Sequence, residues 1–382
     1  MTAGRAVVLG AGPAGATLAR ALARLGYAPV LYEPDPDTAR RLGDLLRQAG
    51  LQLPLICGEG DPQGAALAVE ALEDEPPEAR AARLCALLDR SDPQVPVLTT
   101  ALSAVPGRAI GFRLYAPAHL RSLVEIAAGP QAPAAQVEAA FALARSMGRH
   151  PVAAPHDRPS IGTRLLRRLC EAADTMLMDG AIPHELDEAM VAFGWDMGVY
   201  EAQDLIGLAE AYADRKAQAG ARNPARRYIP ISDRMVEEGR LGKAAGVGWY
   251  RYPGGGGAVI DPLVEDLIRE EAWFAGVTPR SFTAAEMQQR LLLALVHESA
   301  LMLADGTAAR AADIDTVSRE GLGFPAARGG VIAWADARGM ALVAADLARL
   351  TQEDPLVWTV PAALLDCARQ GGRLSEWRPA GR

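Results

Sequence analysis

The feature that most constrains the fold is the segment RAVVLGAGPAGATLARALARLGYAPVLYEPD at the start of the chain. Ala6 to Leu9 is typical of a short buried strand, and Val30 to Tyr32 is typical of a second one. The apolar spacing between them predicts a helix, which opens with the pattern GxGxxG at Gly10, Gly12 and Gly15. A strand, a tight turn, a helix and a strand in this order predict the first unit of a Rossmann domain.

The chemistry of this loop predicts a dinucleotide site. The first glycine permits the sharp turn, the second lets the backbone approach a pyrophosphate, and the third lets helix and strand pack closely. Glu33 ends the second strand and can accept hydrogen bonds from the adenosine ribose, which favours NAD over NADP. FAD stays open at this point, because GAGPAG before a strand that ends in Glu also begins many flavoproteins. The predicted cofactor-binding residues are Gly10, Ala11, Gly12, Pro13, Ala14, Gly15 and Glu33.

Composition narrows the classes of partner. The chain has 382 residues with a net charge of -8, which argues against nucleic acid or acidic membranes as main partners. It has no apolar run long enough for a membrane span, and no leader segment precedes the first strand, so we expect no signal peptide. The cysteines show no metal-ligand spacing, so we expect cytoplasmic thiols and no metal. They are Cys57, Cys85, Cys170 and Cys367.

Further strands complete the predicted sheet. Ala65 to Glu73 is typical of a strand that runs into an acidic loop, and Val95 to Thr100 is typical of another. Pro76 to Leu88 has helical character between them. We therefore expect a Rossmann domain over residues 1–154.

Six later segments resemble one family. They are AVEALEDE, GFRLYAPAHLRSLVEIAAG, GRHPVAA, LMDGAIPHELDEAMVAFGWDMGVYEAQDLIGL, GRLGKAAGVGWYRY and GLGFPAARGGVIAWADARGM. The second is similar to GxHFFNPxxxxxLVEVxxG and the last to GxGFPxxRGGPxxYADxxG. Together they resemble the 3-hydroxyacyl-CoA dehydrogenase family, and more narrowly the dehydrogenase half of the multifunctional β-oxidation enzymes. The resemblance implies an oxidoreductase of fatty acid metabolism that uses NAD rather than FAD. It also leads us to expect that the hydratase half is absent, because the chain begins at the Rossmann strand.

An internal repeat is visible in the second half of the chain. EAADTMLMDG at Glu171 and ESALMLADG at Glu298 are both predicted helices that end in Asp-Gly, and each precedes a Leu-Asp or Ile-Asp helix start. The glycine-rich segment RYPGGGGAVIDP separates them. We expect an α/β Rossmann domain followed by two related all-α domains, at residues 155–253 and 261–382. The resemblance implies that these two domains make the chain a pseudo-dimeric monomer.

The resemblance also implies where the catalytic residues stand. The family removes the hydroxyl proton with a histidine that is held by a glutamate twelve residues later. The same step back from Glu125 leads to Arg113, so the orienting acid is present and the base is not. The acids of the strand beside the nicotinamide, Glu70 and Glu73, are the remaining predicted cofactor residues.

Three more polar positions of the family pattern differ here. The asparagine of HFFNP falls on Ala116, and the asparagine before the arginine of GFxxNR falls on Thr163. The serine that positions the substrate oxygen falls on Thr100. Together with Arg113 and Glu125, these three complete the predicted catalytic set.

An arginine cannot act as a base near pH 7, because its pKa is about 12 or more. Arg113 can pair with Glu125, or stabilise a developing alkoxide as a hydrogen-bond donor. Tyr115 and His119 are conceivable substitute bases, and His119 is better explained as peripheral. Reduction with a proton from solvent is then easier than oxidation.

The acyl carrier and the activity stay open from the sequence. The family inserts a helical pair that helps to hold the CoA nucleotide, and the short spacing after Glu33 leaves little room for it. The substrate is therefore an acyl thioester of CoA or of an acyl carrier protein, or a free acid. Three hypotheses remain: an NAD-dependent oxidoreductase, a degenerate member that binds NAD or an acyl ligand as a sensor or scaffold, and a non-redox enzyme that keeps the dinucleotide for structure.

Overall fold

The computed structural model describes residues 4–72, 75–102, 104–117 and 120–379. The chain forms two compact units, Met1–Ser160 and Ile161–Arg382. The last strand of the sheet ends at Ala154, and the second unit begins at Ile161 with a helix.

The first unit is built on one eight-stranded sheet of order β3-β2-β1-β4-β5-β6-β7-β8. Neighbouring strands pair in parallel except for β6 and β7, which are antiparallel. Its strands are β1 (Gly4–Leu9), β2 (Tyr27–Glu33), β3 (Leu55–Cys57), β4 (Leu67–Glu70), β5 (Val97–Thr99), β6 (Ile110–Leu114), β7 (Leu123–Ala128) and β8 (His150–Ala154). The fold class expected from the sequence is confirmed for this unit, since its strand order is that of a Rossmann domain with a short extension.

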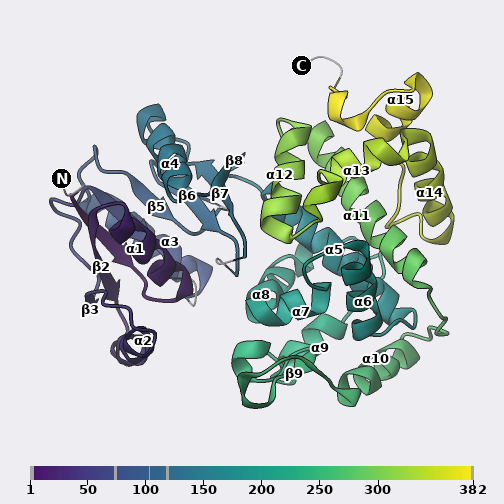
Figure 1. The fold of residues 1–382 in the computed structure, drawn as a ribbon, viewed down its shortest axis with the longest axis horizontal. Helices are drawn as coiled ribbons and strands as arrows, with labels where there is room; N and C mark the ends of the chain where they lie inside the picture. The colour runs from purple at the N-terminus through teal and green to yellow at the C-terminus, as the bar shows by residue number, and fades with distance from the viewer. Residues whose placement is uncertain (1–3, 73–74, 103, 118–119, 380–382) are drawn as a thin grey trace. The chain divides into compact units, whose positions relative to one another are not determined.

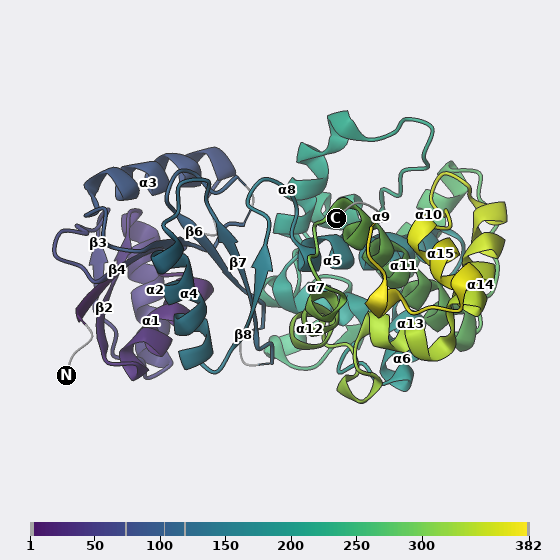
Figure 2. The ribbon, with the colours of Figure 1, turned by 90° about the horizontal axis from the view of Figure 1, so that it is seen from above.

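The two faces of this sheet are covered by the helices α1 (Pro13–Arg24), α2 (Pro36–Gln48), α3 (Pro77–Arg90) and α4 (Ala134–Ser146). One buried cluster joins the sheet to α1, α2 and α4, and a second joins it to α3. Figure 2 shows α3 on one face of the sheet and α1, α2 and α4 on the other. The central strands are therefore buried on both faces, which explains their continuous apolar sequences.

The glycines of the first loop are required by close contacts. Gly10 has a φ of +106°, and a Cβ atom there would lie 2.3 Å from the carbonyl oxygen of Ala71. A Cβ atom at Gly15 would lie 2.0 Å from the carbonyl oxygen of Gly10. A larger residue at either position would force the loop, α1 and the end of β4 apart.

The second unit is helical (Figure 1). Its helices are α5 (Ile161–Met178), α6 (Pro183–Phe193), α7 (Val199–Ile206), α8 (Ala209–Ala217), α9 (Ile231–Glu237), α10 (Pro262–Phe274), α11 (Ala284–Asp305), α12 (Ala311–Leu322), α13 (Val331–Arg338), α14 (Met340–Glu353) and α15 (Ala362–Gln370). A small hairpin of β9 (Tyr250–Arg251) and β10 (Val259–Ile260) lies between α9 and α10. Among the residues that the structure describes, no helix has both the length and the apolar character needed to cross a membrane.

The internal repeat appears as two equivalent helix junctions. Asp187 in α6 accepts hydrogen bonds from the backbone N–H groups of Tyr200 and Glu201 at the start of α7. Asp315 in α12 accepts from Ile332 and from the next residue at the start of α13. Each carboxylate caps the following helix, so the repeat expected from the sequence is confirmed.

A second pair of acids repeats in the same way. Asp204 in α7 accepts from the backbone N–H groups of Trp249 and Tyr250, at 2.8 and 2.9 Å. Asp336 in α13 accepts from Leu374 at 2.7 Å and from the next residue at 3.3 Å. The long helices α5 and α11 pack against each other (Figures 1 and 2). The two repeats therefore share one helical core.

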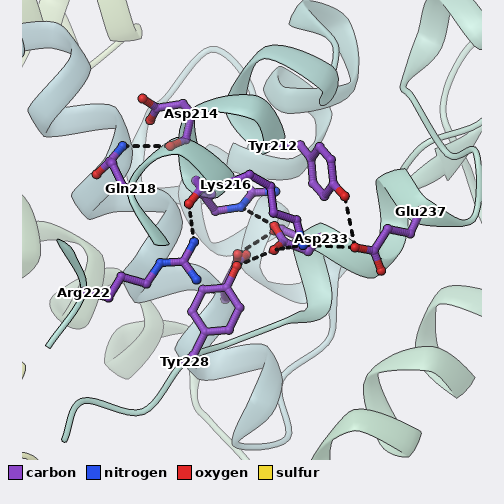
Figure 3. Close-up of polar contacts among 11 residues, drawn as sticks. Tyr212, Asp214, Lys216, Gln218, Arg222, Tyr228, Asp233 and Glu237 are labelled. Atoms are coloured by element: carbon purple, nitrogen blue, oxygen red, sulfur yellow. Dashed lines mark hydrogen bonds and ion pairs between the residues drawn. The ribbon is translucent and has the colours of Figure 1, made fainter. Parts of the chain in front are cut away.

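Helix α8 is attached by polar contacts, since none of its residues is buried. Tyr212 and Lys216 both donate to Glu237 of α9, at 3.0 and 3.1 Å. Arg215 donates to Asp233 at 2.6 Å, and Tyr228 donates to the same carboxylate. Figure 3 shows the side chains of Tyr212, Lys216 and Tyr228 around Asp233 and Glu237.

Candidate active site

The loop between β1 and α1 presents backbone N–H groups at a helix end. Gly12 is the N-cap of α1, Pro13 lies in the first turn, and no side chain caps this end. A Cβ atom at Gly12 would meet nothing within 4 Å, so a ligand can approach the backbone closely here. The N–H groups at a helix N-terminus stabilise negative charge. The loop thus fits the phosphates of a dinucleotide, as the sequence predicts for Gly10 to Gly15.

Glu33 lies beside this loop at the carboxyl end of β2. Its Oε2 accepts a hydrogen bond from the backbone N–H of Ala11 at 3.2 Å, and its Oε1 accepts from that of Asp35 at 3.5 Å. Burial raises the pKa of the Glu33 carboxyl, and these two backbone donors oppose the rise. The predicted ribose acceptor is therefore held next to the glycine loop.

Glu70 lies at the carboxyl end of β4, where both of its carboxylate oxygens already have donors. Leu72 N and Arg80 Nε donate to Oε1 at 2.8 and 3.1 Å. Thr99 Oγ1 and Arg80 Nη2 donate to Oε2 at 2.5 and 3.1 Å. Glu70 thus binds Leu72, Arg80 and Thr99 together at the carboxyl end of the strand. Glu73, the other acid predicted here, lies outside the described residues.

Thr100 follows β5 at the same edge of the sheet. Its side-chain oxygen accepts a hydrogen bond from Arg80 Nη2 at 2.8 Å, and the residue is only 6% exposed. Sequence reasoning selected Thr100 but not Arg80. The arginine comes from α3, and only the packing of that helix reveals it.

Arg113 and Glu125 face each other across two neighbouring strands. They are register partners of the antiparallel pair β6 and β7, so their side chains project to the same face of the sheet. Glu125 is fully buried, and the Arg113 guanidinium lies 5.7 Å from the centroid of the Tyr115 ring. The structure therefore brings together the two residues that the twelve-residue spacing selected.

Two hydroxyl groups converge on the Glu125 carboxylate. Tyr115 and Ser160 each donate to Oε2, both at 2.5 Å. Such short hydrogen bonds to a charged acceptor satisfy the buried carboxylate. Sequence reasoning considered Tyr115 only as a substitute base and missed Ser160. The sequence did contain a signal for Tyr115, because a tyrosine stands there where the pattern HFFNP has its second phenylalanine.

Tyr115 is a poor candidate for a base. Burial, followed by the negative charge of Glu125, raises the pKa of its phenol well above the usual 10. The phenol therefore stays protonated near pH 7 and donates a hydrogen bond to Glu125. The other proposed substitute, His119, lies outside the described residues.

The last two predicted positions lie on different units. Ala116 follows β6 in the first unit, and Thr163 lies in the first turn of α5 in the second unit. The methyl group of Ala116 has no polar atom to offer to a substrate. Tyr115 and Ser160 already donate their single hydroxyl protons to Glu125, so of these three described neighbours it is the Arg113 guanidinium that can stabilise negative charge on an oxygen.

Family models match both units of the chain. The model described as 3-hydroxyacyl-CoA dehydrogenase, NAD binding domain, matches residues 93–158. The model described as 3-hydroxyacyl-CoA dehydrogenase, C-terminal domain, matches residues 161–252. The two matches meet near the boundary between the two compact units.

Curated relatives include peroxisomal bifunctional enzymes. The chain is 34% identical over 249 residues to the enzyme of Danio rerio, which covers 62% of this chain and 34% of that protein. It is 28% identical over 387 residues to the enzyme of Cavia porcellus, which covers 91% of this chain and 53% of that protein. The chain thus spans between about a third and about half of the length of these relatives.

Solved structures show the same fold. The 3-hydroxybutyryl-CoA dehydrogenase of Escherichia coli K12 superposes with a TM-score of 0.74 at 20% identity, over 97% of this chain and 99% of that one. The dehydrogenase part of multifunctional enzyme 1 from C. elegans gives 0.67 at 18% identity, over 96% and 90%. At this identity the likeness concerns the fold.

Proposed function

The chain belongs to the 3-hydroxyacyl-CoA dehydrogenase family, and we propose that it is an NAD-dependent oxidoreductase with a changed catalytic site. Its substrate is a 3-hydroxyacyl or 3-oxoacyl thioester, or a related acid. The observation that carries this proposal is the pairing of Arg113 with Glu125 across β6 and β7, with Tyr115 and Ser160 donating to the same carboxylate.

NAD is the cofactor of this family's N-terminal domain, and the loop residues fit it. The open approach at Gly12 and the N-terminus of α1 suit its pyrophosphate, and Glu33 beside the loop suits its adenosine ribose. When bound, the cofactor supplies or accepts the hydride. The protein's own residues then have to position the substrate and control charge and protons.

The Arg113 side chain sets the direction in which the reaction is easier. A guanidinium cannot take the proton of a hydroxyl group near pH 7, so oxidation of an alcohol lacks a base at this position. During reduction of a ketone, negative charge develops on the carbonyl oxygen, and a fixed guanidinium can stabilise it. Water then supplies the proton that completes the alcohol. We therefore propose that the protein works best as a reductase.

A second candidate function is supported by the same arginine. If neither solvent nor a neighbour provides the proton efficiently, the protein binds NAD(H) and an acyl ligand without turnover, as a sensor or scaffold. The intact glycine loop supports continued binding in either case.

One experiment separates the two. The protein is incubated with NADH and acetoacetyl-CoA, the loss of NADH absorbance is followed, and NADH binding is measured in parallel by fluorescence. Turnover supports the reductase. Binding without turnover supports the second candidate, and absence of NADH binding contradicts both.

The carrier can be tested with the same assay. Nine residues, Gly58 to Ala66, connect β3 to β4, and the described backbone there contains no helix. This short connection leaves no helical pair to hold a CoA nucleotide. We propose that recognition is concentrated on the acyl part, so acetoacetyl-pantetheine should be reduced about as well as acetoacetyl-CoA. A strong preference for CoA would contradict this.

We also propose a pseudo-dimeric monomer in the cytoplasm. The shared core of α5 and α11 supports the first part, because the second repeat already covers the first. The four cysteines, all among the described residues, are free thiols and support a reducing compartment. Light scattering and fractionation test the two statements separately.

A further inference from the structure

Arg80 connects three polar groups at one edge of the sheet of the first unit. From α3 it donates to both oxygens of Glu70, at 3.1 Å each. Its Nη2 also donates to Thr100 Oγ1 at 2.8 Å. Glu70 is 1% exposed and Thr100 is 6% exposed, so water competes little with these contacts.

The contact with Arg80 fixes the role of the Thr100 hydroxyl. A guanidinium N–H can only donate, so Thr100 Oγ1 accepts, and its single proton remains for a different acceptor. Thr99 shows the opposite arrangement. Its hydroxyl donates to Glu70 Oε2 at 2.5 Å, and its oxygen accepts from the backbone N–H of Ala101. Of these two threonines, Thr100 is therefore the one whose proton is available to a ligand.

This cluster lies next to the glycine loop. The backbone N–H of Ala71 donates to the carbonyl oxygen of Leu9 at 2.7 Å, and Gly10 approaches Ala71 closely. β1 and β4 are neighbours at the point where the strand order reverses. Ligands of open α/β sheets bind outside the carboxyl ends of the strands at this point. A donor here lies in the region where cofactor and substrate would meet.

We propose that Arg80 is a positioning residue that makes Thr100 a fixed hydrogen-bond donor to the substrate oxygen on which negative charge develops. The inference rests on the proposed function, because that function supplies the oxygen. Arg80 acts through Thr100, and its pairing with Glu70 holds the guanidinium in place. A preorganised donor of this kind typically contributes about 10²–10³-fold to kcat.

The competing explanation is that Arg80 only joins α3 to the sheet. If Arg80 only joins α3 to the sheet, its loss lowers stability, and any effect on kcat is the same whether or not Thr100 has its hydroxyl group. If Arg80 positions Thr100, the two effects are coupled, and removing Arg80 lowers kcat little further once the Thr100 hydroxyl group is gone. A double-mutant cycle measures this coupling directly.

The test uses the full chain with Thr100→Val, Arg80→Met, the double variant and Arg80→Lys. Arg83→Met is the matched control, because Arg83 lies on the same helix and pairs with Glu59 and Glu75 instead. The kcat and KM for acetoacetyl-CoA reduction, the NADH Kd and thermal unfolding are measured for each. We expect kcat to fall about 100-fold for Thr100→Val and about tenfold for Arg80→Met. The double variant should match Thr100→Val, Arg80→Lys should recover part of the loss, and NADH Kd should stay within about twofold.

The outcomes separate this inference from the proposed function. Multiplicative losses in the double variant, or an Arg80→Met effect on stability alone, would overturn the positioning role while the reductase stands. If the wild-type protein binds NADH without turnover, the reductase proposal fails. The same cycle is then read from acetoacetyl-CoA Kd values in the presence of NADH, where coupled losses support the inference and equal Kd values overturn it. A wild-type complex that binds no acetoacetyl-CoA overturns both.

Discussion

Acidification should destabilise the second unit through His297, and the size of the effect follows from its surroundings. The imidazole lies in α11, is 6% exposed, and has Nε2 at 3.0 Å from Thr359 Oγ1. Burial, with the nearby charges of Arg168 and Arg226, lowers its pKa from 6.5 to about 3. The folded protein therefore keeps this ring neutral where the unfolded chain protonates it.

The sign and magnitude follow by linkage. The contribution of His297 to stability is fully present above pH 6.5 and is lost as the pH falls toward 3. Each unit of pH within this window costs about 1.4 kcal/mol. Acidification from pH 7 to pH 5 therefore removes about 2 kcal/mol of unfolding free energy through this residue.

The assay is urea unfolding of wild type and His297→Gln at pH 7 and pH 5. All six tryptophans lie in the second unit, so their fluorescence follows its unfolding. Burial raises the pKa of Asp187 to about 7 and that of Asp174 to about 6. Protonation of these two carboxyl groups on acidification therefore increases the unfolding free energy. The difference between wild type and variant removes these contributions, and exposed His150→Gln serves as the control. The reasoning is refuted if His297→Gln loses as much stability as wild type between the two pH values.

Four further predictions test the site and the repeat. Arg113→His alone should leave reduction of acetoacetyl-CoA within about tenfold of wild type, because Ala116 and Thr163 still lack the amide groups of the family pattern; a larger gain would contradict this. Tyr115→Phe should destabilise the first unit by about 1.5–3 kcal/mol, since a charged acceptor loses a donor, and hydrogen exchange of β6 and β7 measures it. Asp315→Ala should lower the unfolding free energy of the second unit by about 1 kcal/mol through loss of the α13 cap, as read by tryptophan fluorescence. Salt at about 1 M should speed hydrogen exchange in α8 but not in α11, because ion pairs attach α8 and screening weakens them.

The parts of the fold that the sequence predicted depend on local patterns. The order of β1, α1 and β2 followed from three glycines and the apolar spacing around them, and the contacts at Gly10 and Gly15 explain why those glycines are needed. The helical repeat followed from two Asp-Gly helix ends. In the structure the repeat is seen in the equivalent capping by Asp187 and Asp315. Each acid accepts from backbone N–H groups more than ten positions away in the sequence. That pairing requires the packed helices and could not be read from spacing.

The site was predictable only where the spacing of two residues in the sequence also fixes their pairing across neighbouring strands. Arg113 and Glu125 are joined by a hairpin, so a fixed number of residues places them opposite each other. Ser160 reaches the same carboxylate from beyond β8, and Arg80 reaches Thr100 from α3. Both contacts are set by tertiary packing, to which sequence spacing gives no access.

Three buried acids among the described residues of the first unit, Glu33, Glu70 and Glu125, show how the site can differ from the family pattern while the fold is kept. A buried carboxylate without donors costs several kcal/mol, so a change that removes the donor of Glu125 has to be accompanied by new ones. Tyr115 and Ser160 provide two hydroxyl donors at that position, while Arg80 does the same for Glu70 and a backbone N–H for Glu33. Hydroxyl groups thus donate to Glu125, where the family pattern has a histidine. Because the Tyr115 and Ser160 protons are already donated to Glu125, the catalytic question is whether Arg113 and Thr100 serve the substrate oxygen, and the coupling between Arg80 and Thr100 measures the second contribution.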